Sequence, residues 1–214
     1  MARYYAYRGD NNASIGHYLR AAELFRGFDR FNYYNRLMGT GARYASWGNP
    51  AKALFYLRQA LRAPRRWGLR TFIYHTIAQL RLQQHDYPGA LQAVDQALRL
   101  PARGPGFSLS RPFEKPQGLT LKSAVLLALG RPAEARPLLQ QAQRLADSLR
   151  LPLTRTGIAL QLDATWAGYY AATRNPAQAE KAWLAANRAA RTSGTTLLRL
   201  EYLRGLAEFY QGQK

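Results

Sequence analysis

The side chains that most often carry chemistry are scattered along this chain of 214 residues. Its three histidines, His17, His75 and His85, lie far apart, and no cluster of His, Asp and Glu has the spacing of a metal site. There is no cysteine, which excludes a disulfide framework, a thiolate metal site and a cysteine nucleophile. The 12 carboxylates occur singly, and there is neither a glycine-rich phosphate loop nor a G-x-S-x-G turn. We therefore expect no enzymatic activity, no metal and no cofactor.

Positive charge is the strongest feature of the composition. The chain has 31 basic and 12 acidic side chains, a formal net charge of +19. The excess is spread along the chain, because residues 1–107 carry 16 basic and 5 acidic side chains and the rest carry 15 and 7. Such a field attracts nucleic acid, acidic protein surfaces or anionic membrane. The alternative is an arginine-rich outer surface that only meets solvent.

One group of arginines is dense enough to be a candidate site. Arg58, Arg62, Arg65 and Arg66 are spaced i, i+4, i+7 and i+8, which places them on one face of a helix, and Arg70 follows closely. This basic patch could contact phosphate groups. Only Trp67 stands near it as a platform for base stacking, so a solvated outer face is the favoured interpretation.

No segment of the chain has the composition of a membrane span or a leader. The longest apolar run, near residues 124–129, is far shorter than a bilayer span. The first 12 residues mix tyrosine with charged side chains and contain no continuous apolar stretch, unlike a signal peptide. We expect no membrane insertion and a cytoplasmic location.

An internal repeat indicates which elements hold these side chains. A small residue is followed seven positions later by alanine five times, and another small residue lies 12 positions before each pair. The pairs are Ser14/Ala21, Ala53/Ala60, Ala90/Ala97, Ala135/Ala142 and Ala179/Ala186, and the preceding residues are Ala2, Gly41, Ala78, Ser123 and Ala167, with Gly205 beginning a sixth copy. The first members of successive pairs are 39, 37, 45 and 44 residues apart. Residues seven apart share a helix face, so small side chains there predict closely packed helix pairs.

Turn signals recur at the same phase of each copy. Gly9-Asp10, Gly48-Asn49-Pro50, Asp86-Tyr87-Pro88, Gly130-Arg131-Pro132 and Asn175-Pro176 each precede the second helix of a pair. Asn is a favoured N-cap, and Pro suits the first helical position. His85 stands where glycine is usual, which predicts a local hydrogen-bonding role. The predicted helices are 2–8, 13–28, 34–47, 51–63, 70–84, 88–99, 119–129, 132–149, 156–173, 177–191 and 196–211.

With these residues the chain resembles the tetratricopeptide repeat family. Gly41, Tyr44, Gly48-Asn49, Ala53, Ala60 and Pro64 match that family's pattern of a small residue, an aromatic, a turn, two alanines and a proline. Ala78, Asp86-Tyr87, Ala90, Ala97 and Pro101 match nearly as well, whereas the later copies depart from it: Leu126 replaces an aromatic, and neither ends in proline. Pentatricopeptide RNA readers fit less well, since their period of 35 is stricter.

The resemblance implies an all-α, right-handed superhelical solenoid of antiparallel helix pairs, with about five repeats in one domain over 1–214. The expected repeats are 1–33, 34–69, 70–115, 116–159 and 160–195, with a partial copy at 196–214. Four prolines and three glycines in 101–118 predict a surface insertion that is not helical throughout. By the phase of the repeat, Met1 falls inside a first helix and Lys214 falls at the turn before a second helix. We therefore expect the chain to be a piece of a longer protein. Segments such as residues 145–149 resemble the repeat regions of bacterial signalling proteins.

In the resembled family the first helices line a concave groove that binds a protein or peptide. Carried over by position, the groove residues expected here are Asn35, Met38, Phe72, His75, Gln79, Gln161, Arg199 and Tyr202. For Phe72 and Tyr202, packing in the core is at least as good an interpretation. The lysine of the carboxylate clamp that some members use is replaced by Met38 and His75. We expect a non-catalytic protein- or peptide-binding scaffold that is a regulatory module of a larger signalling protein; the alternative is a basic solenoid that binds nucleic acid.

Overall fold

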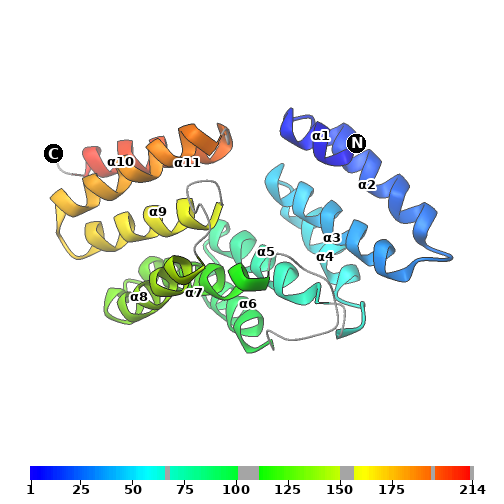
Figure 1. Cartoon of the computed structure of the whole chain (residues 1–214), viewed down its shortest axis with the longest axis horizontal. Coiled ribbons are helices and arrows are strands. Elements are labelled where there is room, and N and C mark those ends of the chain that lie inside the picture. Colours follow the sequence, from blue (N-terminus) through cyan, green and yellow to red (C-terminus); the bar gives the residue numbers. More distant parts are fainter. Residues whose placement is uncertain (66–67, 101–110, 150–156, 194–195, 213–214) are drawn as a thin grey trace. The chain divides into compact units, whose positions relative to one another are not determined.

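The computed structural model describes residues 1–65, 68–100, 111–149, 157–193 and 196–212. It divides the chain into two compact units, Met1–Leu109 and Ser110–Lys214. Figure 1 shows that every element drawn as a ribbon is a helix. The all-α class expected from the sequence is therefore confirmed for the described residues. A single continuous solenoid over the whole chain stays a prediction.

The helices lie close to the predicted ranges. The first unit contains α1 (Ala2–Tyr7), α2 (Asn11–Phe25), α3 (Arg30–Ser46), α4 (Pro50–Ala60), α5 (Arg70–Gln83) and α6 (Tyr87–Arg99). The second contains α7 (Arg111–Ala128), α8 (Pro132–Ser148), α9 (Gly157–Ala172), α10 (Pro176–Ser193) and α11 (Thr196–Gln211).

The start of α7 differs from the prediction. It begins at residue 111 and not 119, so the last part of the predicted insertion is helical; residues 101–110 lie outside the described residues. Pro112 falls in the first turn, where no backbone N–H is needed. Pro116 lies further inside but is fully buried, and its carbonyl accepts a hydrogen bond of 2.8 Å from the Thr120 hydroxyl. The helix thus continues through a proline that is buried in the core.

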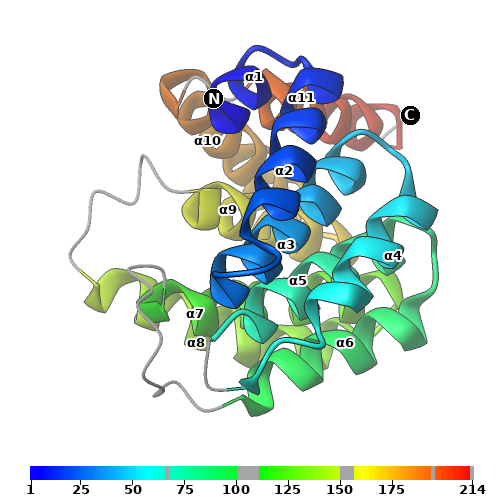
Figure 2. The same cartoon turned by 90° about the vertical axis from the view of Figure 1, so that its right-hand side faces the viewer.

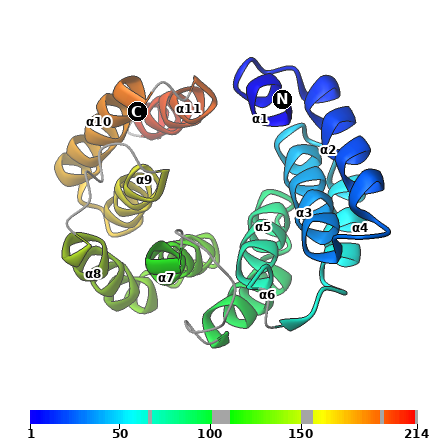
Figure 3. The ribbon, with the colours of Figure 1, turned by 45° about the vertical axis from the view of Figure 1, so that its right-hand side comes forward.

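Within each unit the helices pack in sequential pairs. Figure 2 shows α3 beside α4 and α5 beside α6, and Figure 3 shows α7 beside α8 and α9 beside α10. The first helices of successive pairs also touch, α3 with α5 and α7 with α9. The repeat of small residues in the sequence predicts this stacking, because each helix pair must bury its apolar face against the next pair.

The small residues of the repeat lie at these helix contacts. Both members of the pairs on α4, α6, α8 and α10 are buried, and so are Gly41, Ala78, Ser123 and Ala167 on the first helices. A Cβ at Gly41 would lie 2.7 Å from Cγ of Leu57 and 3.1 Å from the carbonyl oxygen of Ala53. The Ser14 hydroxyl donates to the Ala2 carbonyl at 2.8 Å. The predicted close approach of paired helices is confirmed at these positions.

One turn geometry joins the helices of all five pairs. The residue before each cap has a positive φ: 77° at Gly9 and Gly48, 60° at His85, 70° at Gly130 and 56° at Arg174. The next residue donates its N–H to the carbonyl five positions back, as Asn49 does to Tyr44 (2.9 Å) and Asn175 to Tyr170 (2.8 Å). This pattern is the Schellman motif, which satisfies carbonyls at a helix end. At His85 the ring Nδ1 lies 2.9 Å from the Tyr87 hydroxyl, so its predicted local role is confirmed.

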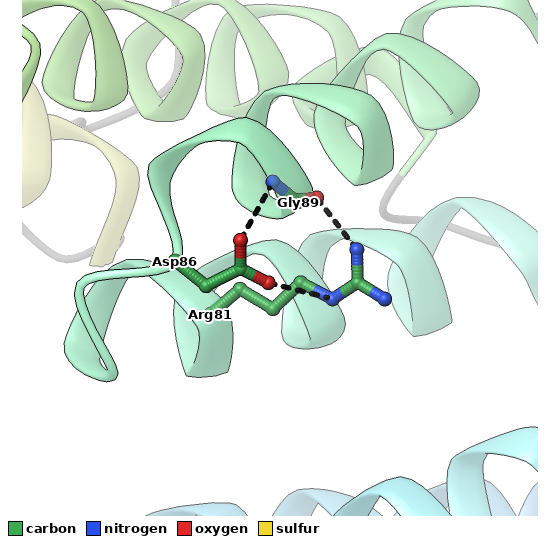
Figure 4. Close-up of polar contacts among 3 residues, drawn as sticks. All are labelled: Arg81, Asp86 and Gly89. Carbon is green, nitrogen blue, oxygen red and sulfur yellow. Dashed lines mark hydrogen bonds and ion pairs between the residues drawn. The ribbon is translucent and has the colours of Figure 1, made fainter.

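The turn between α5 and α6 has an additional polar bridge (Figure 4). The Asp86 carboxylate accepts the Gly89 N–H at 3.0 Å, and Arg81 donates to the Gly89 carbonyl at 3.0 Å while lying 3.7 Å from Asp86. The carboxylate satisfies a free amide of the first turn of α6, as an N-cap should. The arginine ties the last turn of α5 to the first turn of α6.

Candidate binding surfaces

The predicted groove residues of the first unit come from α3 and α5, which are in contact. Asn35, Met38 and Gln79 are half-buried, and Phe72 is 43 % exposed, so all four reach the surface. The side-chain amides of Asn35 and Gln79 have no hydrogen-bond partner among the described residues. His75 is only 3 % exposed, which places its side chain in the core. We call these two amides and two apolar side chains on adjacent helices, Asn35, Met38, Phe72 and Gln79, the α3–α5 face.

The predicted groove residues of the second unit differ from one another in their exposure. Gln161 is half-buried and Arg199 is exposed. Tyr202 is 3 % exposed and packs with Ala186 and Ala190, its ring 6.3 Å from that of Trp183. Its position in the core agrees with the packing interpretation of this residue. Phe72, for which the same interpretation was open, lies at the surface instead.

The Tyr202 hydroxyl is buried, and no described residue forms a hydrogen bond with it. Burial, helped by the negative charges of Glu201 and Asp163, raises the pKa of Tyr202 above its ordinary value of 10.0. The folded state therefore holds this proton more tightly than the unfolded state does. The resulting stability is complete below about pH 10 and is lost as the pH rises above it.

Replacing Tyr202 by phenylalanine should reduce this alkaline loss. We expect the wild-type free energy of unfolding to fall by up to about 1.4 kcal/mol per pH unit above pH 10 from this group, and the slope of Tyr202→Phe to be smaller by that amount. At neutral pH the variant should be as stable as the wild type or more stable, because it removes an unsatisfied buried hydroxyl. Urea titrations from pH 7 to 11 measure both effects. Parallel curves for the two proteins would contradict the prediction.

The basic patch is only partly a surface feature. Arg58, Arg62 and Arg65 are exposed, whereas Arg66 and Trp67 lie outside the described residues. Arg70 is half-buried, and its guanidinium donates to the Leu61 carbonyl at 2.9 Å. The Arg70 side chain therefore pairs with a carbonyl group at the C-terminal end of α4 and is not available to a ligand. The spacing of the arginines in the sequence does not reveal this contact.

An aromatic side chain of α4 lines one hollow with two of these arginines. Phe55 is 56 % exposed and lines a shallow hollow of about 450 Å³ with Arg58, Arg62, Ala51 and Gln59. The sequence interpretation considered Trp67 as the only stacking platform and missed Phe55. The signal was present, because Phe55 lies three residues before Arg58 and seven before Arg62.

The second unit contains an aromatic hollow that the sequence interpretation missed. It has a volume of about 290 Å³ and lies between α8 and α9, where it is lined by Arg136, Gln140, Trp166, Tyr169, Tyr170, Thr173 and Asn175. The Trp166 and Tyr170 rings are stacked with centroids 5.6 Å apart, and Tyr169 meets Trp166 edge-on at 5.6 Å. The spacing of these rings at i, i+3 and i+4 on one helix was the signal that could have revealed it.

The described residues offer neither a metal site nor a membrane span. In the part of the chain that the structure describes, no three His, Cys, Asp or Glu side chains are grouped as a metal site would require. None of the described helices combines the length and apolar character of a membrane span.

In comparisons with known proteins, no family model matches the chain, and no curated protein matches it significantly.

Proposed function

We propose that this chain is a non-catalytic binding scaffold that takes a protein or peptide segment on the α3–α5 face. The observation that carries the proposal is the pair of half-buried amides, Asn35 and Gln79, that have no partner among the described residues. A primary amide can both donate to and accept from a peptide backbone. Met38 and Phe72 offer apolar contact beside them, as a peptide site needs.

The wider proposal is a tetratricopeptide-type solenoid that serves as a cytoplasmic regulatory module of a larger bacterial signalling protein. Its support is the recurrence of one turn through five helix pairs and of one set of buried small residues in four of them. Helix pairs that stack in this way build extended surfaces suited to binding.

Nucleic-acid binding is the second candidate function. The observation that favours it is the exposed Phe55 beside Arg58 and Arg62, since exposed rings interleaved with cations suit single strands. Such binding depends on released counterions and weakens steeply with salt.

One capture experiment separates the two functions. The immobilised chain is incubated with nuclease-treated and untreated host lysate at low and high salt. Its variants are Asn35→Ala/Gln79→Ala and the control Gln92→Ala/Gln96→Ala, whose glutamines are exposed on α6. We expect a defined protein that survives nuclease and salt, is captured by the control and is lost from the α3–α5 variant. Capture that disappears with nuclease or salt would support the second function, and equal capture by both variants would contradict the first.

A further inference from the structure

We propose that the aromatic hollow of the second unit binds one nucleotide, with its base against the Trp166–Tyr170 rings and its phosphate on Arg136. This site is in a different unit from the α3–α5 face and does not depend on the function proposed for that face.

The rings supply a surface on which another planar ring can stack. Trp166, Tyr169 and Tyr170 are all half-buried, so they are held by the helices yet remain accessible. Trp166 and Tyr170 are inclined by only 23°, which extends one flat stack along α9. Stacking of a base on such aromatic side chains is among the main contributions to single-strand binding.

The polar groups of the hollow select the charge of the ligand. Arg136 is exposed and has no ion-pair partner among the described residues, and no carboxylate lines the hollow. A cation would be repelled by this guanidinium, although the rings alone would attract one. An anion that carries a planar ring uses both features, and the net charge of +19 favours its approach.

Hydrogen-bonding groups line the hollow beside the rings. The Thr173 hydroxyl donates to the Tyr169 carbonyl at 2.9 Å, and the backbone N–H of Asn175 donates to the Tyr170 carbonyl at 2.8 Å. These bonds leave the Asn175 side-chain N–H₂ and the Gln140 amide to meet the edge of a base. The volume of about 290 Å³ is close to the lower limit of small-molecule sites.

A free nucleotide and one residue of a single strand share this chemistry, so the test uses both. Adenosine monophosphate, adenosine, inorganic phosphate and a labelled single-stranded oligonucleotide of about ten nucleotides are titrated into the full chain. Calorimetry follows the small ligands, and fluorescence anisotropy follows the oligonucleotide. The variants are Arg136→Gln and Trp166→Leu, with Arg144→Gln as the matched control, because Arg144 is also exposed on α8 but does not line the hollow. Circular dichroism checks that each variant is folded.

We expect Arg136→Gln and Trp166→Leu each to weaken binding by about tenfold, and Arg144→Gln to have little effect. Binding of adenosine monophosphate with this pattern identifies a free nucleotide as sufficient. Binding of the oligonucleotide alone, with the same pattern, assigns the site to a single strand. The proposal is overturned if neither ligand binds at millimolar concentration. It is also overturned if Arg136→Gln and Arg144→Gln weaken oligonucleotide binding equally, because that result would reflect only the overall charge.

Discussion

Replacing Leu57 by alanine is expected to lower the free energy of unfolding of the first unit by about 2–5 kcal/mol. Leu57 is fully buried on α4 and lies against the α3 residue Gly41 at the contact between the two helices. Removing its isobutyl group loses the transfer free energy and leaves a cavity that the rigid helices cannot fill. Urea unfolding followed by circular dichroism at 222 nm (the helical band) measures the change.

The control is the same substitution at an exposed position. Leu24 lies on α2 with 72 % of its surface exposed, so Leu24→Ala should change the free energy of unfolding by no more than about 0.5 kcal/mol. Comparable losses for the two variants would mean that the close contact between α3 and α4 is not a main source of stability.

Adding one methyl group at Gly41 is expected to destabilise the same contact. A Cβ there would lie 2.7 Å from Cγ of Leu57, which is itself buried and has no room to move. Overpacking of this kind costs about 1–3 kcal/mol, more than the roughly 1 kcal/mol that alanine gains over glycine in a helix. Gly41→Ala should therefore unfold at a lower urea concentration than the wild type.

Gly16 provides a matched control, because it lies inside α2 and a Cβ there would meet nothing within 4 Å. Gly16→Ala should raise the free energy of unfolding by up to about 1 kcal/mol through helix propensity alone. Opposite signs for the two glycine substitutions are the expected result. If Gly41→Ala were also stabilising, the helices would have to separate more easily than their packing indicates.

Local chemistry explains which parts of the fold could be predicted. The helix pairs followed from small residues seven apart, because only small side chains such as Ala53 and Ala60 allow two helices to approach closely. The turns followed from glycine and cap residues, because a positive φ favours glycine and a free N–H favours an Asn or Asp oxygen. His85 was recognised as an exception for the same reason, and its φ of 60° confirms it.

The parts that could not be predicted depend on contacts between helices. Spacing placed Arg70 beside the other arginines, but its guanidinium meets the carbonyl groups that end α4. Spacing also placed His75 on a groove helix, yet its side chain is buried. Proline content suggested that α7 begins late, and the burial of Pro116 was not visible in the sequence. Which face of a helix is covered depends on its neighbours.

The shared turn also bears on how such a chain can diversify. At Gly48 and Gly130 a Cβ would meet nothing within 4 Å, and at the equivalent places His85 and Arg174 already carry large side chains. A Cβ gained there meets no neighbour, and its cost is the backbone strain of an L residue at positive φ, about 1–2 kcal/mol. Mutations at these turns therefore carry a backbone cost but no packing cost, so evolution or an engineer can attach new groups at the edge of a helix pair without redesigning its interior.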